Sequence, residues 1–265
     1  MTTIGVVGTG NMGSALVKGW LRSPDQGLDL LVWDRVASVA GRLLGSGPIA
    51  GAGSLEELAA RADVVVVVVK PKDAKAVLGA LAGRLGEEQT IVSSMAGLTL
   101  EWMRAIVGPG PSLFRIMPNL GVELGVGAVA IAAEPAVPPG RVEEVQKLFA
   151  PLGLAQSVPE EMLDAVTAVS GSGPAFLAVA IESLEDGAVA AGLSRSLART
   201  LVRQTAVRTA QLLSQYSDSP AELRMHLASG GGPGQAGMQT LEDRGIRRAF
   251  QEAVEAALQR SRQLK

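Results

Sequence analysis

Near the start of the chain stands Ile4-Gly5-Val6-Val7-Gly8-Thr9-Gly10-Asn11-Met12-Gly13, an apolar run followed by glycines with the spacing G-x-G-x-x-G. This order predicts a buried strand over 3–7, a turn over 8–13 and a helix over 14–21. The glycines permit a tight turn, a close approach of phosphate to the backbone, and close packing of helix on strand. We therefore expect the helix start to bind the pyrophosphate of a dinucleotide. The residues expected to hold it are Gly8, Gly10, Asn11, Met12 and Gly13.

Two charged residues follow the next expected strand, which covers 29–33. Asp34 stands about twenty residues beyond the glycines, where a carboxylate binds both ribose hydroxyls of NAD and repels the 2′-phosphate of NADP. Arg35 is its neighbour and can pair with that phosphate. Both residues are predicted to contact the cofactor, and the sequence leaves the choice between NADH and NADPH open.

Strand and helix patterns alternate through the first half of the chain. Six consecutive valines, Val64–Val69, are too uniform for a surface strand and are typical of a central parallel strand covered on both faces. Ser54-Leu55-Glu56-Glu57 has the capping-box pattern of a helix start. Further strands are expected over 63–69, 89–93, 113–116 and 126–132. This alternation predicts a doubly wound, mostly parallel α/β sheet of the Rossmann type.

The strand pattern ends at Val158-Pro159-Glu160, and only helical spacing follows. Ser219-Pro220-Ala221-Glu222 combines a capping box with proline at the first helical position. We therefore predict a Rossmann-type domain over 1–158 and an all-α domain over 159–265. Residues 165–192 are apolar on more than one side, which indicates burial either in a subunit interface or in a large monomeric core.

Composition limits the possible functions. The net charge of −2, without long charge runs, argues against nucleic acid or an anionic membrane as a partner. No uninterrupted apolar stretch is long enough for a membrane span, and the amino terminus lacks the basic segment of a signal peptide. The absence of cysteine excludes disulfides and thiol catalysis and fits a reducing cytoplasm. With His226 as the single histidine, neither a metal site nor imidazole acid–base chemistry is expected.

The chain resembles the pyrroline-5-carboxylate reductase family over essentially its full length. The resemblance rests on the glycine run quoted above and on several further segments. These are Val69-Lys70-Pro71, Ser94-Met95-Ala96-Gly97, Arg115-Ile116-Met117-Pro118-Asn119, Asp164-Ala165-Val166-Thr167-Ala168-Val169-Ser170-Gly171-Ser172-Gly173-Pro174-Ala175, Gly192-Leu193 and Gln204-Thr205.

The resemblance implies reduction of the cyclic imine Δ1-pyrroline-5-carboxylate to proline, the last step of proline biosynthesis, usually with NADPH. It also implies a helical dimerisation domain that interlocks with a second subunit, so that the active site lies at the interface of a homodimer or higher homo-oligomer. The cofactor residues that it adds are Val69, Lys70, Pro71, Ser94, Met95, Ala96 and Asn119. The substrate residues are Met117, Asn119, Ser172, Gly173, Pro174, Gly231, Gly232, Pro233 and Gly234.

Three hydroxyl groups are expected to act at the substrate: Thr167, Ser172 and Ser229. Each of the first two has a structural alternative. Thr167 can bond its own helix backbone, and Ser172 can simply cap the helix that follows it. Backbone N–H groups over 229–237 are the expected donors to the substrate carboxylate.

The chain departs from the family near the substrate. Leu120-Gly121 replaces the usual Thr-Pro, and Pro233-Gly234 replaces two threonines of the family loop. Three outcomes remain open: the proline-forming reaction, reduction of another cyclic imine with a six-membered or sulfur-containing ring, or a non-catalytic protein that senses NADP(H). A β-hydroxyacid dehydrogenase needs a lysine in the helical half, and none stands between Lys147 and Lys265.

Overall fold

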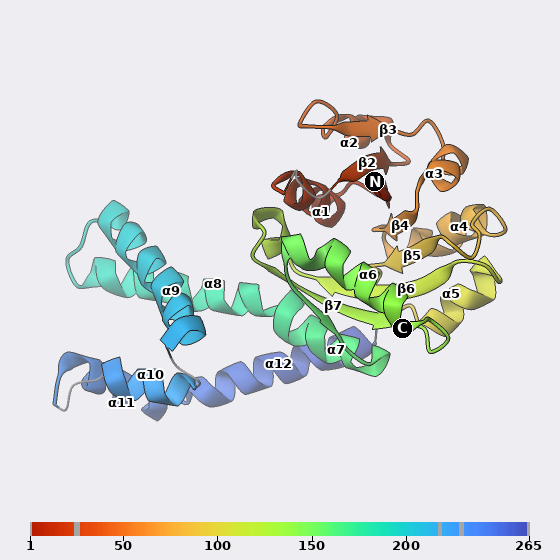
Figure 1. The fold of residues 1–265 in the computed structure, drawn as a ribbon. Helices are drawn as coiled ribbons and strands as arrows, with labels where there is room; N and C mark the ends of the chain where they lie inside the picture. Colours follow the sequence, from red (N-terminus) through yellow and green to blue (C-terminus); the bar gives the residue numbers. More distant parts are fainter. Residues whose placement is uncertain (1, 24–26, 217–218, 228–230, 264–265) are drawn as a thin grey trace. The chain divides into compact units, whose positions relative to one another are not determined.

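The computed structural model describes residues 2–23, 27–216, 219–227 and 231–263, and divides into two compact units (Figure 1). Residues 1–171 and 257–265 form the first unit, and residues 172–256 form the second. The end of the chain therefore rejoins the unit in which the chain began. The expected domain limits, 1–158 and 159–265, stay a prediction.

The first unit is built on one eight-stranded sheet of order β3-β2-β1-β4-β5-β6-β7-β8. All neighbouring strands run parallel except β6 and β7, which are antiparallel. The predicted mostly parallel, doubly wound sheet is therefore confirmed, and the short strands β3 and β8 were not predicted. The strands are β1 (Thr2–Val7), β2 (Leu28–Trp33), β3 (Ile49–Gly51), β4 (Val64–Val67), β5 (Thr90–Ser93), β6 (Ser112–Pro118), β7 (Gly127–Ala133) and β8 (Gly153–Ser157).

Helices connect the strands and then make up the described part of the second unit. Those of the first unit are α1 (Asn11–Leu21), α2 (Ala37–Gly41), α3 (Leu55–Arg61), α4 (Pro71–Leu81), α5 (Leu100–Val107), α6 (Pro139–Phe149) and α7 (Leu163–Val166), which a π-helical turn over Thr167–Gly171 extends. Then follow α8 (Gly173–Ala190), α9 (Arg195–Tyr216), α10 (Pro220–Leu227), α11 (Pro233–Asp243) and α12 (Ile246–Arg262). Among the described residues after 160 no strand occurs, so the predicted helical second half is confirmed.

The valine run builds the centre of the sheet, as predicted. Val64 and Val66 face an apolar cluster that holds Trp20 of α1 and Phe149 of α6. Val65 and Val67 face a second cluster, which the side chains of α3, α4 and α5 complete. Because side chains alternate across a strand, one run of valines supplies both layers of the core.

The predicted capping box at Ser54 has a shifted geometry. The Ser54 hydroxyl oxygen accepts the Glu57 N–H at 3.2 Å. The Glu57 carboxylate reaches back to the Gly53 N–H at 2.8 Å instead of the N–H of Ser54. This bond, with further help from Arg61, lowers the pKa of Glu57. The second predicted cap is also present, since Ser219 accepts the Glu222 N–H at 3.2 Å.

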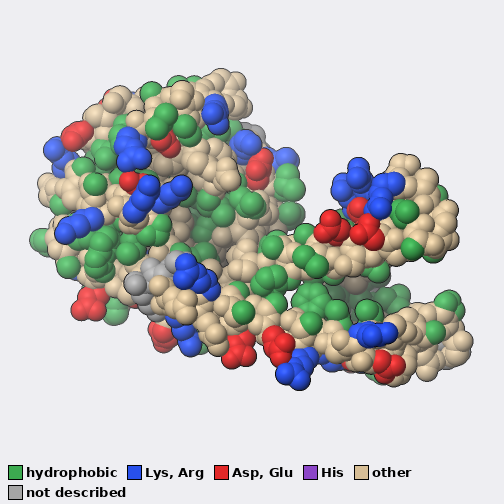
Figure 2. Space-filling view, turned by 180° about the vertical axis from the view of Figure 1, so that it is seen from behind, with side chains coloured by type: hydrophobic (Ala, Val, Ile, Leu, Met, Phe, Trp, Pro, Cys, Tyr) green, Lys and Arg blue, Asp and Glu red, His purple; other side chains and the backbone are tan. Residues whose placement is uncertain are grey.

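The second unit exposes much of its apolar surface. In α8, Leu177, Val179 and Leu184 are 60%, 63% and 58% exposed, and Figure 2 shows apolar side chains along the surface of the helices. The alternative of a large monomeric core around this segment is therefore wrong for the single chain. Glu185 is the buried charge of α8, and it accepts a hydrogen bond from Arg203 of α9 at 3.2 Å.

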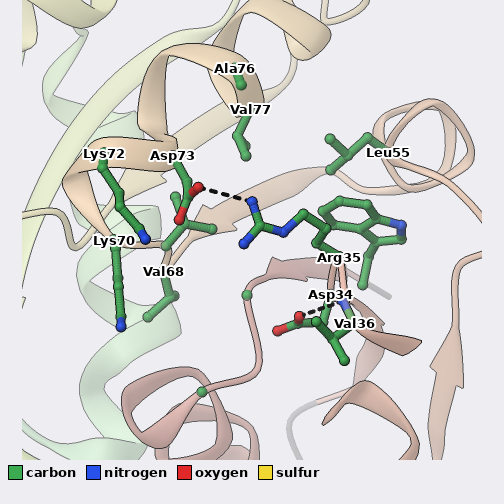
Figure 3. Close-up of a pocket in the computed structure, with 14 residues that line it drawn as sticks. Asp34, Arg35, Val36, Leu55, Val68, Lys70, Lys72, Asp73, Ala76 and Val77 are labelled. Carbon is green, nitrogen blue, oxygen red and sulfur yellow. Dashed lines mark hydrogen bonds and ion pairs between the residues drawn. The ribbon is translucent and has the colours of Figure 1, made fainter. Parts of the chain in front are cut away.

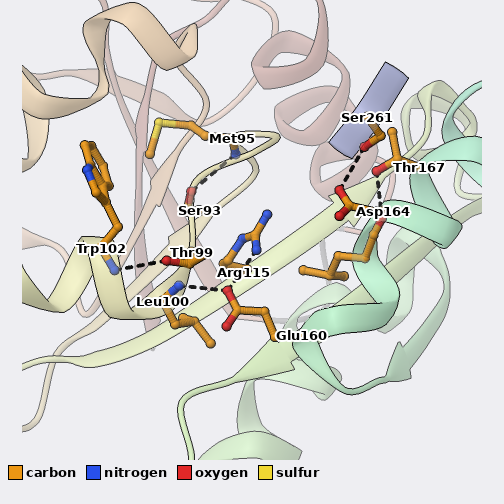
Figure 4. Close-up of polar contacts among 11 residues, drawn as sticks. Ser93, Met95, Thr99, Leu100, Trp102, Arg115, Glu160, Asp164, Thr167 and Ser261 are labelled. Atoms are coloured by element: carbon orange, nitrogen blue, oxygen red, sulfur yellow. Dashed lines mark hydrogen bonds and ion pairs between the residues drawn. The ribbon is translucent and has the colours of Figure 1, made fainter. Parts of the chain in front are cut away.

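The last helix is held to the first unit by a buried polar contact. The Ser261 hydroxyl of α12 donates to the Asp164 carboxylate of α7 over 2.9 Å (Figure 4). Both residues are nearly inaccessible, with 4% and 8% exposure. The bond joins positions 97 residues apart in the sequence, so it fixes where the chain returns to the sheet.

Ser261→Ala should therefore lower the free energy of unfolding by about 1–3 kcal/mol, because it removes a buried donor to a carboxylate. Urea unfolding followed by circular dichroism measures this. The matched control is Arg262→Ala at the next, exposed position, which should change stability by less than about 0.5 kcal/mol. Equal effects of the two substitutions would contradict the assigned role of the bond.

Candidate active site

The turn between β1 and α1 needs glycine at two positions for different reasons. Gly8 has a φ of +94°, a backbone conformation that residues with a side chain rarely adopt. At Gly13 an added Cβ would lie 2.0 Å from the Gly8 carbonyl oxygen, so helix and strand pack too closely for any side chain. At Gly10 an added Cβ would meet no atom within 4 Å. The backbone of Gly10 therefore borders open space at the start of α1.

The amino end of α1 suits an anion. Its first turn contains no acidic residue, and the N-cap residue Gly10 provides no side-chain cap. The Ser14 hydroxyl does not cap the helix either, because it donates to the Thr9 carbonyl at 2.7 Å. The N–H groups of the first turn and the positive end of the helix dipole are therefore directed at the open space beside Gly10.

Asp34 holds this turn in place. One carboxylate oxygen accepts the Thr9 N–H at 2.8 Å and the Thr9 hydroxyl at 3.2 Å. The other accepts the Val36 N–H at 3.0 Å. Because each oxygen already has a partner in the protein, the carboxylate acts as a bridge between the end of β2 and the glycine turn.

A pocket of about 370 Å³ opens beside this turn (Figure 3). It lies beyond the carboxyl ends of β1, β2 and β4, where the order of strands reverses, which is the usual ligand position in such sheets. Of the predicted cofactor residues, Gly8, Gly10, Asp34, Arg35, Val69 and Lys70 line it. The other lining residues are Trp33, Val36, Leu55, Val68, Lys72, Asp73, Ala76 and Val77.

Charges of both signs meet in this pocket. Arg35 extends from the end of β2 and donates to the Asp73 carboxylate at 3.0 Å. Lys70 and Lys72 extend from the start of α4 on the side of Asp73 (Figure 3). Three cations and two carboxylates thus line the pocket, and this excess of positive charge favours a phosphorylated ligand.

Lys72 and Asp73 were missed in the sequence interpretation. The signal was present, because Lys70-Pro71-Lys72-Asp73 follows the valine strand and the carboxyl ends of parallel strands share one edge of the sheet. Trp33 was counted only as a strand residue. As the last residue of β2, it lies at the same edge.

The loop after β5 is braced from below. The Ser94 N–H bonds the Val67 carbonyl at 3.0 Å, and the Ser93 hydroxyl accepts the Met95 N–H at 3.2 Å. Glu160 closes the far end of the loop, since one of its oxygens accepts both the Leu100 N–H at 2.7 Å and Arg115 at 2.8 Å (Figure 4). The predicted cofactor residues Ser94, Met95 and Ala96 therefore stand on a rigid support.

The predicted residues at the end of β6, Met117 and Asn119, are held within the first unit. Met117 is only 9% exposed and packs with Ala130 and Leu163. The Asn119 side chain donates to the Ser170 hydroxyl at 3.1 Å and accepts the N–H groups of Gly121 and Ala128. Asn119 thus joins β6, β7 and the π-helical turn, and its contact with cofactor or substrate stays a prediction.

The hydroxyl residues predicted to be catalytic have distinct positions. Thr167 donates to the Leu163 carbonyl at 2.7 Å, which is the geometry of the structural alternative. Ser172 is the N-cap residue of α8 and makes no side-chain capping bond, and Gly173 and Pro174 follow as the first residues of that helix. Ser229 lies outside the described residues. The catalytic roles of all three stay predictions.

The segment around Pro233, which corresponds to the family loop, is largely helical. Pro233 is the first residue of α11, Gly232 is its N-cap, and Gly231 has a φ of +76°. Gln235 turns back to accept the Gly231 N–H at 2.7 Å. The proline and glycine that replace the family's threonines therefore begin a helix, whose amino end can attract a carboxylate.

Within the described part of the chain, no group of three or more His, Asp or Glu side chains could hold a metal ion. By length and composition alone, one helical run, Glu160–Ala190, is long and apolar enough to cross a membrane, so the expectation that no stretch suffices is wrong by this measure. Only 11% of its most apolar window is buried in this chain.

Comparisons with known proteins find one family model for the helical half of the chain and another for the first part of the nucleotide half. A family model described as pyrroline-5-carboxylate reductase dimerisation matches residues 160–264. A second, described as NADP oxidoreductase, coenzyme F420-dependent, matches residues 3–97. The pyrroline-5-carboxylate reductase of Mycobacterium tuberculosis is 35% identical in an alignment that covers 100% of this chain and 97% of the relative.

Solved structures agree over the same length. A pyrroline-5-carboxylate reductase from Coxiella burnetii has a TM-score of 0.92 at 27% identity and covers 100% of this chain and 98% of its own. The pyrroline carboxylate reductase of Plasmodium falciparum, solved with NADP bound, has a TM-score of 0.86 at 29% identity, with 99% and 98% covered.

The glycine turn yields a prediction that separates binding from folding. Gly10→Val should change the free energy of unfolding by less than about 1 kcal/mol, because its side chain enters open space. It should weaken binding of NADPH on the order of 100-fold, since that space is where we expect the pyrophosphate. Calorimetric titration and urea unfolding measure the two effects.

Gly13→Ala is the matched comparison, because its Cβ would overlap the Gly8 carbonyl oxygen. It should destabilise the fold by about 3 kcal/mol or more. Unimpaired NADPH binding by Gly10→Val would refute the position assigned to the pyrophosphate.

Proposed function

The chain belongs to the pyrroline-5-carboxylate reductase family, and from that premise we propose that it reduces Δ1-pyrroline-5-carboxylate to proline with NADPH. The observation that carries the proposal is the relation over the whole chain, which includes both the nucleotide half and the helical half. The glycine turn and the cationic pocket at the strand reversal support the choice of a dinucleotide phosphate.

The reaction asks for positioning more than for proton transfer. NADPH supplies the hydride, and the protonated imine already carries both its proton and an electrophilic carbon. Transfer of the hydride to that carbon would form a C–H bond, move the π electrons of the C=N bond to nitrogen, and leave the secondary amine of proline with its C–N single bond. The chain must therefore hold the two reactants in register and exclude water. This fits a protein with a single histidine, His226 of α10.

On the cofactor side, the described residues have separate tasks. The first turn of α1 binds the pyrophosphate, and Asp34 keeps that turn fixed through Thr9. Arg35 and the two lysines at the start of α4 attract the 2′-phosphate that distinguishes NADPH from NADH. The braced loop over 94–97 supports the nicotinamide end.

On the substrate side, the amino end of α11 is proposed to bind the carboxylate. Gly231 and Gly232 expose backbone there, and the helix dipole favours the negative charge. The hydroxyls of Thr167, Ser172 and Ser229 are proposed to contact the ring side of the substrate. Binding through backbone groups would explain why this chain can lack the two threonines of the family at 233–234.

The dimerisation model over 160–264 indicates a homo-oligomer. We take the assembly to be a homodimer whose contact surface includes the exposed apolar side chains of α8, and we place the active site at that interface. Coverage by a second subunit also accounts for the apolar character of Glu160–Ala190 without a membrane. The absence of cysteine supports a cytoplasmic location.

The function is tested by turnover. Purified protein with Δ1-pyrroline-5-carboxylate should oxidise NADPH, seen as loss of absorbance at about 340 nm, with formation of proline by chromatography. A six-membered imine acid and NADH are run beside it. Turnover of the six-membered imine alone would show that the substrate is not Δ1-pyrroline-5-carboxylate. NADPH binding without turnover of either imine would favour a sensor.

The dimer is tested at Leu177. Leu177→Arg places a charge on an apolar face and should convert the dimer to monomer, with loss of activity on the order of 100-fold, because an unpaired charge in an interface costs several kcal/mol. Sedimentation equilibrium measures the mass. Leu154→Arg on β8 is the matched control, since Leu154 is similarly exposed at 63% but lies in the first unit. A dimeric and active Leu177→Arg would remove α8 from the interface.

A further inference from the structure

An ion pair crosses the dinucleotide pocket. Arg35 stands at the end of β2 and Asp73 in the first turn of α4, and their Nη1 and Oδ1 atoms lie 3.0 Å apart (Figure 3). The Arg35 side chain is 74% exposed and that of Asp73 is 27% exposed. The contact is therefore open to solvent and weak, so a ligand can displace it.

The two partners are held on separate supports. Arg35 directly follows Asp34, whose carboxylate is bonded to Thr9 and Val36, so the backbone at the end of β2 has little freedom. The backbone of Asp73 is held by its N–H, which donates to the Lys70 carbonyl at 2.9 Å. The positive end of the α4 dipole also stabilises its carboxylate. Because the Arg35 side chain is long and 74% exposed, it can change partners while the backbones of both residues stay in place.

We propose that Asp73 is a specificity-determining residue, which lowers the preference for NADPH over NADH by competing with the 2′-phosphate for Arg35. The inference rests on the proposed use of a nicotinamide dinucleotide. A guanidinium binds a phosphate and a carboxylate through the same fork of N–H groups. Asp73 occupies Nη1 of Arg35, so the 2′-phosphate obtains the full fork of N–H groups only when Arg35 leaves Asp73, whereas NADH leaves the ion pair intact.

The same competition would let the pocket accept NADH as well as NADPH. Lys70 and Lys72 remain to attract a phosphate, and the Asp34 carboxylate stays bonded to Thr9 of the turn. The Arg35–Asp73 pair then keeps the pocket closer to neutral when no 2′-phosphate is present. The chemical group that is discriminated is a phosphomonoester on the ribose.

A double-mutant cycle tests the competition. Calorimetric titration gives the dissociation constants of NADPH and NADH for wild type, Asp73→Asn, Arg35→Gln and the double variant. Asp73→Asn should tighten NADPH binding about two- to five-fold and change NADH binding by less than about 1.5-fold. In the Arg35→Gln background, the same substitution should change NADPH binding by less than about 1.5-fold.

Glu88→Gln is the charge control, because it removes one negative charge from a residue that is 98% exposed outside this pocket. It should leave both dissociation constants unchanged. An equal gain from Asp73→Asn with and without Arg35 would mean simple repulsion of the phosphate and would overturn the competition. Equal gains for NADPH and NADH would overturn the specificity role. Failure of the wild type to bind either dinucleotide would instead refute the proposed function.

Discussion

The closest contact in the glycine turn sets the geometry of the nucleotide half. Because the Cα of Gly13 packs against the Gly8 carbonyl, α1 begins directly above the end of β1. The carboxylate of Asp34 then joins this turn to β2 through Thr9. The start of the helix, the ends of the strands and the cationic wall of the pocket all take their places from these contacts.

Much of this arrangement could be predicted from the sequence, because the signals are local or periodic. The glycine spacing predicted the turn, and the valine run predicted a strand buried on both faces. β3 and β8 were missed because each is short and partly exposed, so neither shows a clear alternation of apolar and polar residues. Helical spacing predicted the second half down to its cap at Ser219.

Contacts between residues far apart in the sequence could not be predicted from local patterns or periodicity. Arg35 and Asp73 meet because the order of strands brings the end of β2 and the start of α4 to one edge of the sheet. Pro233 and Gly234 stand where the family has a loop. In this chain a helix begins there, with Gly232 as its N-cap and proline at its first position. The bond from Thr9 to Asp34 was missed for the same reason, since the two residues are 25 positions apart in the sequence.

The return of α12 to the first unit affects how the chain can fold during translation. The second unit is inserted between two segments of the first, so the segment from residue 257 on belongs to the first unit although it is translated after the second. The amino-terminal part of a chain leaves the ribosome first, and early domains commonly fold while later ones are still being made. Here the buried contact of Asp164 forms only after Ser261, 97 residues later, has left the exit tunnel, so the first unit cannot complete its fold before the second unit has been translated.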